Sequence, residues 1–489
     1  MLTPILLLAA VTVAGSGCAR NPVSGRPEVT LVSAEQERRM GQEEAEKVET
    51  QIGLLDDARL TAYLEALGQR LARESPRQDV AYRFHIVDMT EPNAFALPGG
   101  YIYVSRGLLA LMNAEDELAG VVGHEIAHVA ARHSVQRISK QGPIAALFGI
   151  ASGIAGLVVP LAGDVIGGIG DLTQSLIFAP YSRSQETEAD RVGQDIAARA
   201  GWDPAALSKS LTALGREADL MSQVPRRPSF FDSHPATPDR VARTAEHART
   251  STRASRPPLS ASAAAFVARL DGLVVGPRAA RGVIVGRTFV HPAANVFIEF
   301  PEKWAVQQTP DKVLAVSPDR EAAVLLRAAG KGQDPLDGAR ALEKATKSPI
   351  VAGTERITIN GLPAAHTGLE ADGKVGVDLT WIAHGGTIFQ VVGLAPRQRF
   401  ASVRPTLAAV TRTFRPLTAT ERAGVTERRI RLITARAGET IEALASRSRS
   451  AWTKEELAVA NGLAVSDRLT AGQVIKAAIA EPYQPGPAR

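Results

Sequence analysis

Two histidines and a glutamate have the spacing of a metal site. His124 and His128 are four residues apart, and Glu125 directly follows the first histidine in an apolar, helix-forming run. Residues four apart lie on one face of an α-helix, so both imidazoles can bind one metal ion beside the Glu125 carboxylate. Histidine and carboxylate ligands suit Zn²⁺, which keeps three protein ligands in catalytic sites. The pattern predicts one zinc ion; the alternative is a buried helix whose histidines bond to backbone.

An acid-rich helical segment farther along the chain is the expected source of the third ligand. Glu186 and Asp190 are four residues apart and therefore share a helix face. One of them can ligate the metal while the other orients a ligating imidazole. Glu188 points to roughly the opposite side of the helix, which makes it the weaker candidate. Taken alone, such an acidic run is usually a solvated surface.

The elements that position these residues are amphipathic helices and a small sheet. Residues 34–73 repeat apolar side chains at three- and four-residue steps, which is typical of such helices. Residues 93–104 have the pattern of strand, turn and strand. We expect the strand after the turn to expose an unpaired edge to which an extended substrate adds, with Asn93, Ala94 and Phe95 in the groove. A plain hairpin is the alternative.

Four segments, in this order, resemble peptidase family M48 and more narrowly its exported bacterial lipoprotein branch: Asn93–Gly100, Gly123–His128, Tyr181–Arg183, and Glu186 with Asp190. The resemblance covers roughly residues 21–250. It implies that His124, His128 and Glu186 bind zinc, that Glu125 is the catalytic residue, and that Asp190 orients a ligand. Metzincins are excluded, because their pattern requires Gly and His where this chain has Ala131 and Ser134.

The segment Asp232–Arg240 also resembles a family element that lies near the active site. It contains His234 followed by a proline. The resemblance leaves two roles open for His234: a donor to the oxyanion that develops during peptide hydrolysis, or a ligand that occupies the open position of the zinc and holds the enzyme idle. A histidine that only packs the loop is the third alternative.

The N-terminus has the pattern of an export signal. Residues 1–13 are almost entirely apolar, and small residues lead to Cys18, the single cysteine, which rules out an internal disulfide framework. This resembles a lipoprotein signal peptide over residues 1–18, with Cys18 as the lipidated residue; an ordinary signal peptide cleaved near Cys18 is the alternative, and either one implies export. Ala19 after the cysteine implies the outer membrane. We therefore expect a periplasmic, lipid-anchored protein.

A second apolar stretch follows the histidine helix. Residues 141–163 carry no charge and are long enough to cross a bilayer. A single span would place His128 and Glu186 on opposite sides of the membrane, so the metal site could not assemble. We expect instead a lid over the cleft or a segment that dips into the membrane interface; core packing is the alternative.

Composition narrows the classes of partner. The chain has 489 residues, of which 45% are hydrophobic and 22% charged, so it is a multidomain globular protein rather than a disordered one. Its formal net charge is +5, but no Lys/Arg block with interleaved aromatic residues is present. We therefore expect no nucleic-acid partner.

The C-terminal half contains a second kind of motif. Residues 430–477 resemble a LysM module, a small βααβ fold that binds N-acetylglucosamine-containing glycans such as peptidoglycan. The resemblance implies glycan contacts from Glu439, Thr440 and Asn461. A degenerate module that serves only for packing is the alternative. The intervening residues 281–418 show strand and helix patterns but no spacing that indicates chemistry.

These features together predict an α+β multidomain protein. In chain order we expect a mainly helical zincin-type peptidase domain with a small sheet (19–250), a linker (251–280), an α+β domain of unknown role (281–418) and a βααβ LysM-like module (430–477). The predicted function is a zinc endopeptidase of the bacterial envelope, whose substrates the family resemblance implies to be misfolded or misassembled envelope proteins. The alternative is a peptidoglycan-binding lipoprotein that acts as a scaffold or chaperone with a structural or latent metal site.

Overall fold

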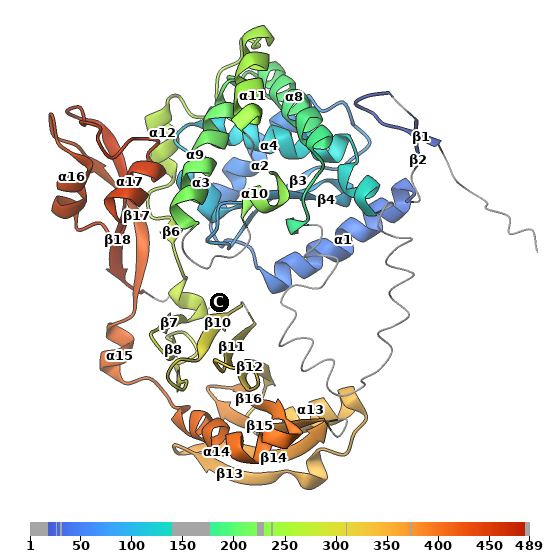
Figure 1. The fold of residues 1–489 in the computed structure, drawn as a ribbon, viewed down its shortest axis with the longest axis vertical. Coiled ribbons are helices and arrows are strands. Elements are labelled where there is room, and N and C mark those ends of the chain that lie inside the picture. Colours follow the sequence, from blue (N-terminus) through green and yellow to red (C-terminus); the bar gives the residue numbers. More distant parts are fainter. Residues whose placement is uncertain are drawn as a thin grey trace, which may run out of the picture.

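The protein consists of a mainly helical N-terminal part, a separate β-rich part and a small C-terminal module (Figure 1). The computed structural model describes residues 18–25, 27–29, 32–138, 177–222, 229–235, 238–309, 311–371 and 374–484. The expected signal sequence before Cys18 and the expected lid over residues 141–163 lie outside these ranges. Mixed helix and strand content, several sheets and several domains were all predicted, and all are confirmed.

Helices make up most of the N-terminal part. They are α1 (Ala34–Gln51), α2 (Ala58–Ala72), α3 (Arg106–Leu111), α4 (Glu115–Ala130), α8 (Arg183–Ala200), α9 (Ala206–Met221), α10 (Phe230–Ser233), α11 (Pro238–Thr250) and α12 (Ala263–Arg269). Three of them, α1, α8 and α10, begin at a capping box. In the first two, the side chain of Ser33 or Ser182 accepts from the third helical N–H, and the serine N–H donates to the glutamine side chain at that third position. Helix α4 starts with three acidic residues, which the helix dipole favours at that end.

Helices α4 and α8 pack closely, and two glycines allow this. A Cβ atom on Gly123 of α4 would lie 2.8 Å from the carbonyl oxygen of Gly193 on α8. A Cβ atom on Gly193 would lie 2.6 Å from the backbone nitrogen of His124. Any side chain at either position would therefore push the helices apart. This close approach brings the histidines of α4 next to the acidic face of α8.

The small sheet beside α4 has the order β3-β5-β4, formed by Arg83–Val87, Tyr101–Ser105 and Ala94–Leu97. The predicted strand, turn and strand are confirmed as the antiparallel pair β4 and β5. Our expectation that the strand after the turn forms the exposed edge is wrong. Strand β5 is central because β3 pairs with it in parallel on its other side. The edge strands of this sheet are β3 and β4, so β4 is the edge strand of the predicted pair.

The segment 251–280, expected to be a linker, instead contributes to the core. It contains α12 and the short strand β6 (Val274–Val275). Phe266 of α12 is fully buried in the same hydrophobic cluster as α2, α4 and α9. Only residues 251–262 carry the Ser- and Pro-rich composition that suggested a linker. That composition is confined to the residues that precede α12 and does not extend into the helix.

The β-rich part contains a seven-stranded antiparallel sheet in the order β10-β11-β12-β16-β15-β14-β13 and a three-stranded sheet in the order β7-β8-β9. The strands of the large sheet are Ala305–Gln308, Lys312–Val316, Ala323–Lys331, Thr387–Pro396, Val375–His384, Leu362–Ala371 and Glu355–Ile359, in that spatial order, and those of the small sheet are Val283–Val285, Thr288–His291 and Val296–Glu299. Helix α13 (Leu336–Thr346) packs with Leu325 on one face of the large sheet. Helix α14 (Arg397–Thr413) packs on the opposite face with Val324 and Leu326, the residues on either side of Leu325 in the chain.

The C-terminal module follows a short helix, α15 (Ala419–Ala423), and is docked on the N-terminal part. Its elements are β17 (Thr426–Thr434), α16 (Ile441–Ser448), α17 (Lys454–Ala460) and β18 (Val474–Pro482). Strand β17 pairs with β6 as well as with β18. The buried Lys476 Nζ donates to Ala110 O and Met112 O at the end of α3, each at 2.7 Å. The module is therefore anchored to the N-terminal part through both a sheet and a buried amine.

None of the helices in the described ranges combines the length and the apolar character needed to cross a bilayer. A pair of short strands, β1 (Cys18–Arg20) and β2 (Pro27–Val29), precedes α1.

Candidate metal centre

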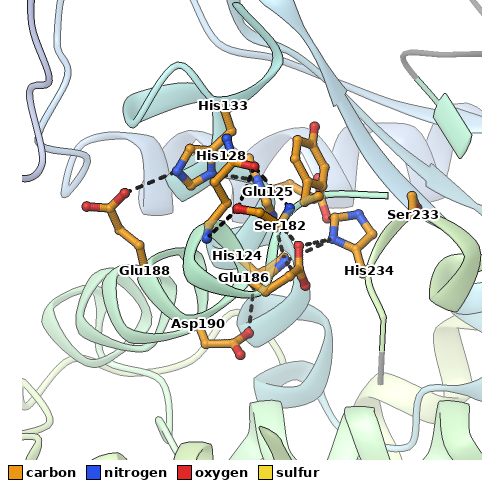
Figure 2. Close-up of polar contacts among 12 residues, drawn as sticks. His124, Glu125, His128, His133, Ser182, Glu186, Glu188, Asp190, Ser233 and His234 are labelled. Carbon is orange, nitrogen blue, oxygen red and sulfur yellow. Dashed lines mark hydrogen bonds and ion pairs between the residues drawn. The ribbon is translucent and has the colours of Figure 1, made fainter. Parts of the chain in front are cut away.

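Helix α4 presents both motif histidines to one point. The Nε2 atoms of His124 and His128 lie 3.0 Å apart, and both residues are buried, with 0% and 1% of their surface exposed. Glu125 lies beside them and is fully buried. The predicted common helix face therefore brings the two imidazoles together inside the protein, as Figure 2 shows.

Glu186 on α8 completes a set of three. Its Oε1 atom lies 3.2 Å from His128 Nε2. His234 adds a fourth ligand atom, the third nitrogen of the set, and the four ligand atoms all lie within 4.8 Å of one another. Ligands at about 2.1 Å from a tetrahedral zinc ion stand roughly 3.4 Å apart, so separations of 3.0 to 3.2 Å between neighbouring atoms fit such an ion. The donor set and the geometry both suit zinc.

Asp190 and Arg240 hold this set in place. Asp190 Oδ1 lies 3.0 Å from His124 Nδ1, which fixes the ring so that Nε2 faces the other ligands. Arg240 pairs with Glu186 at 2.6 Å and with Asp190 at 2.7 Å. The two acidic residues thus divide the roles left open by the sequence: Glu186 lies among the ligand atoms and Asp190 behind them.

Sequence reasoning missed the partner of His128. His133 Nδ1 lies 2.9 Å from His128 Nδ1, and His133 Nε2 lies 3.1 Å from a carboxylate oxygen of Glu188. Glu188, which we set aside as a ligand, therefore supports His128 through His133. Tyr181 stacks on the His128 ring with 4.0 Å between centroids. The tyrosine lies in a segment already noted in the sequence, but the role of His133 had no spacing signal.

The pKa shifts of His128 and Glu186 favour the forms that bind a metal ion. Burial by itself would lower the pKa of His124, but its hydrogen bond to Asp190 and the charge of Glu186 raise it above the usual value. Burial lowers the pKa of His128 well below its usual value, so its imidazole is neutral and can donate a lone pair. Burial by itself would raise the pKa of Glu186, but the charges of His234 and Arg240 lower it well below the ordinary value. Glu186 is therefore ionised, the form in which a carboxylate can bind a metal ion.

Glu125 is different from the other acidic residues of the site. Both of its carboxylate oxygens are buried without a hydrogen-bond partner in the described part of the chain. Burial raises its pKa above the usual value. A carboxylate that is unpartnered, raised in pKa and adjacent to the ligand atoms has the properties of a general base.

His234 is brought to the site by α10. Its Nδ1 atom lies 3.1 Å from Glu186 Oε1 and 3.2 Å from His124 Nε2. Its ring stacks on Phe230 at 4.4 Å between centroids, and its carbonyl oxygen accepts from Arg240 at 3.2 Å. His234 is therefore a buried member of the ligand cluster and not a loop-packing residue on the surface.

The predicted groove residues lie along the edge strand. Ser105 N donates to Asn93 O, so the backbone of Asn93 faces β5, and Pro92 and Ala94 face the open edge by alternation. Phe230 N donates to Pro92 O at 3.0 Å, which places α10 along that edge. The side chain of Phe95 packs in the core against Tyr103 rather than in a groove.

The predicted glycan residues of the C-terminal module are engaged within the protein. Glu439 accepts two hydrogen bonds from Arg447, at 2.7 and 2.8 Å. Thr440 caps α16 through Ala443 N. Asn461 donates to Leu457 O and Lys476 O and accepts from Lys476 N. Each of these three side chains therefore makes at least one hydrogen bond within the module.

Comparison with known proteins supports two modules. The model of peptidase family M48 matches residues 58–248, and the model of the LysM domain matches residues 433–477. The mitochondrial metalloendopeptidase OMA1 of Schizosaccharomyces pombe is 30% identical over 46% of this chain and 65% of its own. The beta-barrel assembly-enhancing protease of Escherichia coli is 29% identical over 45% of either chain. Metalloprotease LoiP of Escherichia coli is 31% identical over 37% of this chain and 67% of its own.

The similarity lies in the N-terminal part of the chain, where the metal centre is. The chain spans about half to two thirds of the length of these curated relatives. The predicted family and the predicted LysM module are both confirmed. The ligand cluster on α4 and α8, the family match and the relatives agree: this chain belongs to peptidase family M48 and carries a LysM domain at residues 433–477.

Proposed function

We propose that this protein is a zinc-dependent endopeptidase of the bacterial cell envelope. The observation that carries the proposal is the convergence of His124, His128 and Glu186 beside the unpartnered carboxylate of Glu125. The similarity to the metalloproteases OMA1 and LoiP supports it. The reaction is hydrolysis of a peptide bond.

The roles of the residues follow from their positions. A bound zinc ion supplies Lewis-acid chemistry, which acidifies a water molecule and polarises a carbonyl group. Glu125 accepts the proton of the attacking water at a carboxylate oxygen and passes it to the leaving amine. Asp190 and His133 keep the His124 and His128 rings oriented during this transfer. The extended substrate lies along β4, where Ala94 offers its backbone N–H and C=O.

The proposed location of the enzyme is the outer membrane. The predicted signal over residues 1–18 and the predicted lipidation of Cys18 would hold it at the outer membrane, facing the periplasm. The LysM domain would bring it near peptidoglycan. Substrates of the proposed enzyme are misfolded or misassembled envelope proteins, since the E. coli relative is described as enhancing β-barrel assembly.

We also propose that the resting site is closed by His234. The ring occupies the fourth position of the ligand cluster, and Phe230 N of α10 donates to the carbonyl oxygen of Pro92, two residues before the edge strand β4. Substrate and α10 would compete for this edge, so α10 has to move before a peptide can bind. This favours the regulatory role over that of oxyanion donor.

Substitution of His234 by alanine distinguishes these two roles. If His234 closes the site, His234→Ala increases cleavage of denatured casein severalfold, because the edge and the fourth position become accessible. If His234 is an oxyanion donor, the same variant loses cleavage. The initial rate of peptide release at saturating zinc decides between them, and a loss of rate contradicts the resting-state proposal.

Substitution of Glu125 tests the enzyme itself. Glu125→Gln should retain zinc but lower cleavage by about 10²- to 10⁴-fold, the usual contribution of a general base. The variant is made in both the wild-type and the His234→Ala backgrounds, so that a closed resting site cannot hide the effect. Glu246→Gln, a matched change at an exposed residue of α11, is the control and should cleave normally.

The same assay addresses the alternative of a scaffold or chaperone. A scaffold would show no zinc-dependent cleavage in either background, whatever its affinity for peptidoglycan sacculi. The internal bonds made by Glu439, Thr440 and Asn461 give this alternative little support.

A further inference from the structure

The large sheet of the β-rich part ends at a strand with one open side. Strand β13 is the last in the order β10-β11-β12-β16-β15-β14-β13 and pairs only with β14. Figure 1 shows β13 at the lower boundary of this part, below α14. No other backbone among the described ranges bonds to its outer side. An open edge of this kind can accept an added strand.

The register shows which backbone groups are available. A two-residue turn, Asn360–Gly361, joins β13 to β14, and both turn residues have positive φ, at 49° and 80°. Such a turn closes with a hydrogen-bonded pair, here Ile359 and Leu362, and bonded pairs then alternate with non-bonded ones. Thr358 is therefore in a non-bonded pair, and its N–H and C=O point outward. Its partner Pro363, which has no N–H, agrees with this register.

A groove runs between this edge and helix α14. A cavity of about 470 Å³ lies there, and its apolar walls are Ile357 and Ile359 from β13 and Ala401, Pro405 and Ala408 from α14. The strand residues are two apart and the helix residues three, four or seven apart, so each element presents one face to the cavity. The cavity thus offers apolar contacts to alternate side chains of a chain lying along β13.

The exposed charged groups of the groove are positive. Asp378, the carboxylate at the floor, is buried and already paired with His366 at 3.0 Å and Arg404 at 3.4 Å. Arg404 and Arg412 are exposed on α14, and Arg412 has no carboxylate partner in the described part of the chain. A ligand of this groove should therefore bring a carboxylate of its own.

We propose that the groove between β13 and α14 binds an extended polypeptide segment that carries a carboxylate, by addition of a strand to β13. Main-chain bonds to Thr358 would fix the segment, the apolar walls would take alternate side chains, and Arg412 would pair with its carboxylate. The site is separate from the metal centre and does not depend on peptide hydrolysis. It gives the domain over residues 281–418 a binding role.

The test uses the full chain with Glu125→Gln, so that no probe is cleaved. The probe is a fluorescein-labelled ten-residue peptide of alternating valine and threonine that ends in two glutamates. Thr358→Pro removes the outward N–H but no bond to β14, and proline is tolerated on edge strands. It should lower affinity about tenfold in fluorescence anisotropy, the equivalent of one or two lost hydrogen bonds. Thr358→Val keeps the N–H and should bind like the parent.

A charge variant keeps the proposal testable if proline disturbs the strand. Arg412→Gln should weaken binding severalfold and lessen its dependence on salt, whereas Arg399→Gln, a change on the same helix at a residue paired with Asp319, should not. A probe that ends in two glutamines should bind the parent as weakly as the glutamate probe binds Arg412→Gln. Equal affinity of the glutamate probe for Thr358→Pro and Thr358→Val, or for Arg412→Gln and Arg399→Gln, would overturn the proposal.

Discussion

The metal centre and the LysM domain were both predicted from short motifs, but the polar side chains of the two motifs differ in what they contact. At the metal centre, nitrogen and oxygen atoms from α4, α8 and the segment after α10 converge on one point, and Glu125 accepts no hydrogen bond from the described residues, although its Oε1 lies 3.5 Å from His234 Nε2. In the LysM domain, Glu439, Thr440 and Asn461 all bond to their own module. The first set is available for a ligand, whereas the second is already used.

This difference has a physical basis. Buried polar groups are nearly always satisfied, so an unpartnered carboxylate such as that of Glu125 costs free energy that a functional role can explain. A capping threonine or an asparagine bridging two backbone segments lowers the free energy of its own fold and needs no ligand. The side chains of Glu439, Thr440 and Asn461 thus stabilise their own module, and the buried amine of Lys476 shows what that module packs against. The following predictions test this contrast.

The largest expected effect is on metal content. Glu186→Ala removes an ionised ligand, and we expect zinc affinity to fall by more than about 100-fold, because loss of a mere supporting partner already costs 10- to 100-fold. Cleavage should fall in parallel. Elemental analysis after dialysis against a weak chelator measures the bound zinc.

The matched control is the same change in the LysM domain. Glu439→Ala also removes a carboxylate that is paired with arginine, but it should leave zinc content unchanged. Retention of a full zinc equivalent in Glu186→Ala would remove this residue from the ligand set. Loss of zinc in both variants would point to unfolding and not to ligation.

Some of the metal centre was predictable because its residues obey helical periodicity. His124 and His128 are one turn apart on α4, and Glu186 and Asp190 are one turn apart on α8, so spacing alone placed each pair on one face. His133 was not predictable in this way. Helix α4 ends at Ala130, and the chain reverses through Arg132, whose φ is 56°, before His133 returns to His128. Periodicity carries no information beyond the end of a helix.

Non-local pairing limited the prediction of the sheets in the same way. The hairpin of β4 and β5 is local and was predicted, but the parallel pairing of β3 with β5, which makes β4 the edge, joins segments separated by a turn and a second strand. The burial of Phe266 in the supposed linker likewise depends on helices far away in the sequence. Which polar side chains of the LysM domain are already used also depends on the completed fold.

An intermediate effect is expected at the anchor between the two parts. Lys476→Met leaves Ala110 O and Met112 O without their donor, and unsatisfied buried groups cost about 1 to 3 kcal/mol each. We expect unfolding, followed by tryptophan fluorescence, to reach its midpoint at a lower urea concentration. Zinc content and cleavage per folded molecule should be unchanged. A midpoint equal to that of the parent would mean that the amine contributes no net stability.

The same residue predicts a dependence on pH. Burial lowers the pKa of Lys476 to about 7, below the value of about 10.4 for a lysine in an unfolded chain. Between these two pKa values the unfolded chain binds a proton that the folded chain does not. The contribution of Lys476 to the free energy of unfolding therefore rises from pH 7 to pH 10 and is lost as the pH falls through about 7. In Lys476→Met, the free energy of unfolding should lose this rise between pH 7 and pH 10.

The smallest effect is expected at Thr440, and it tests the contrast most closely. Thr440→Ala removes the cap of α16, which costs about 1 kcal/mol, whereas Thr440→Ser keeps the hydroxyl and should cost much less. If the side chain serves only as a cap, both variants bind peptidoglycan sacculi as the parent does, at temperatures where all are folded. Loss of sacculus binding in Thr440→Ala with its fold intact would make the hydroxyl a glycan contact. The LysM domain would then, like the metal centre, use its motif residues for a ligand.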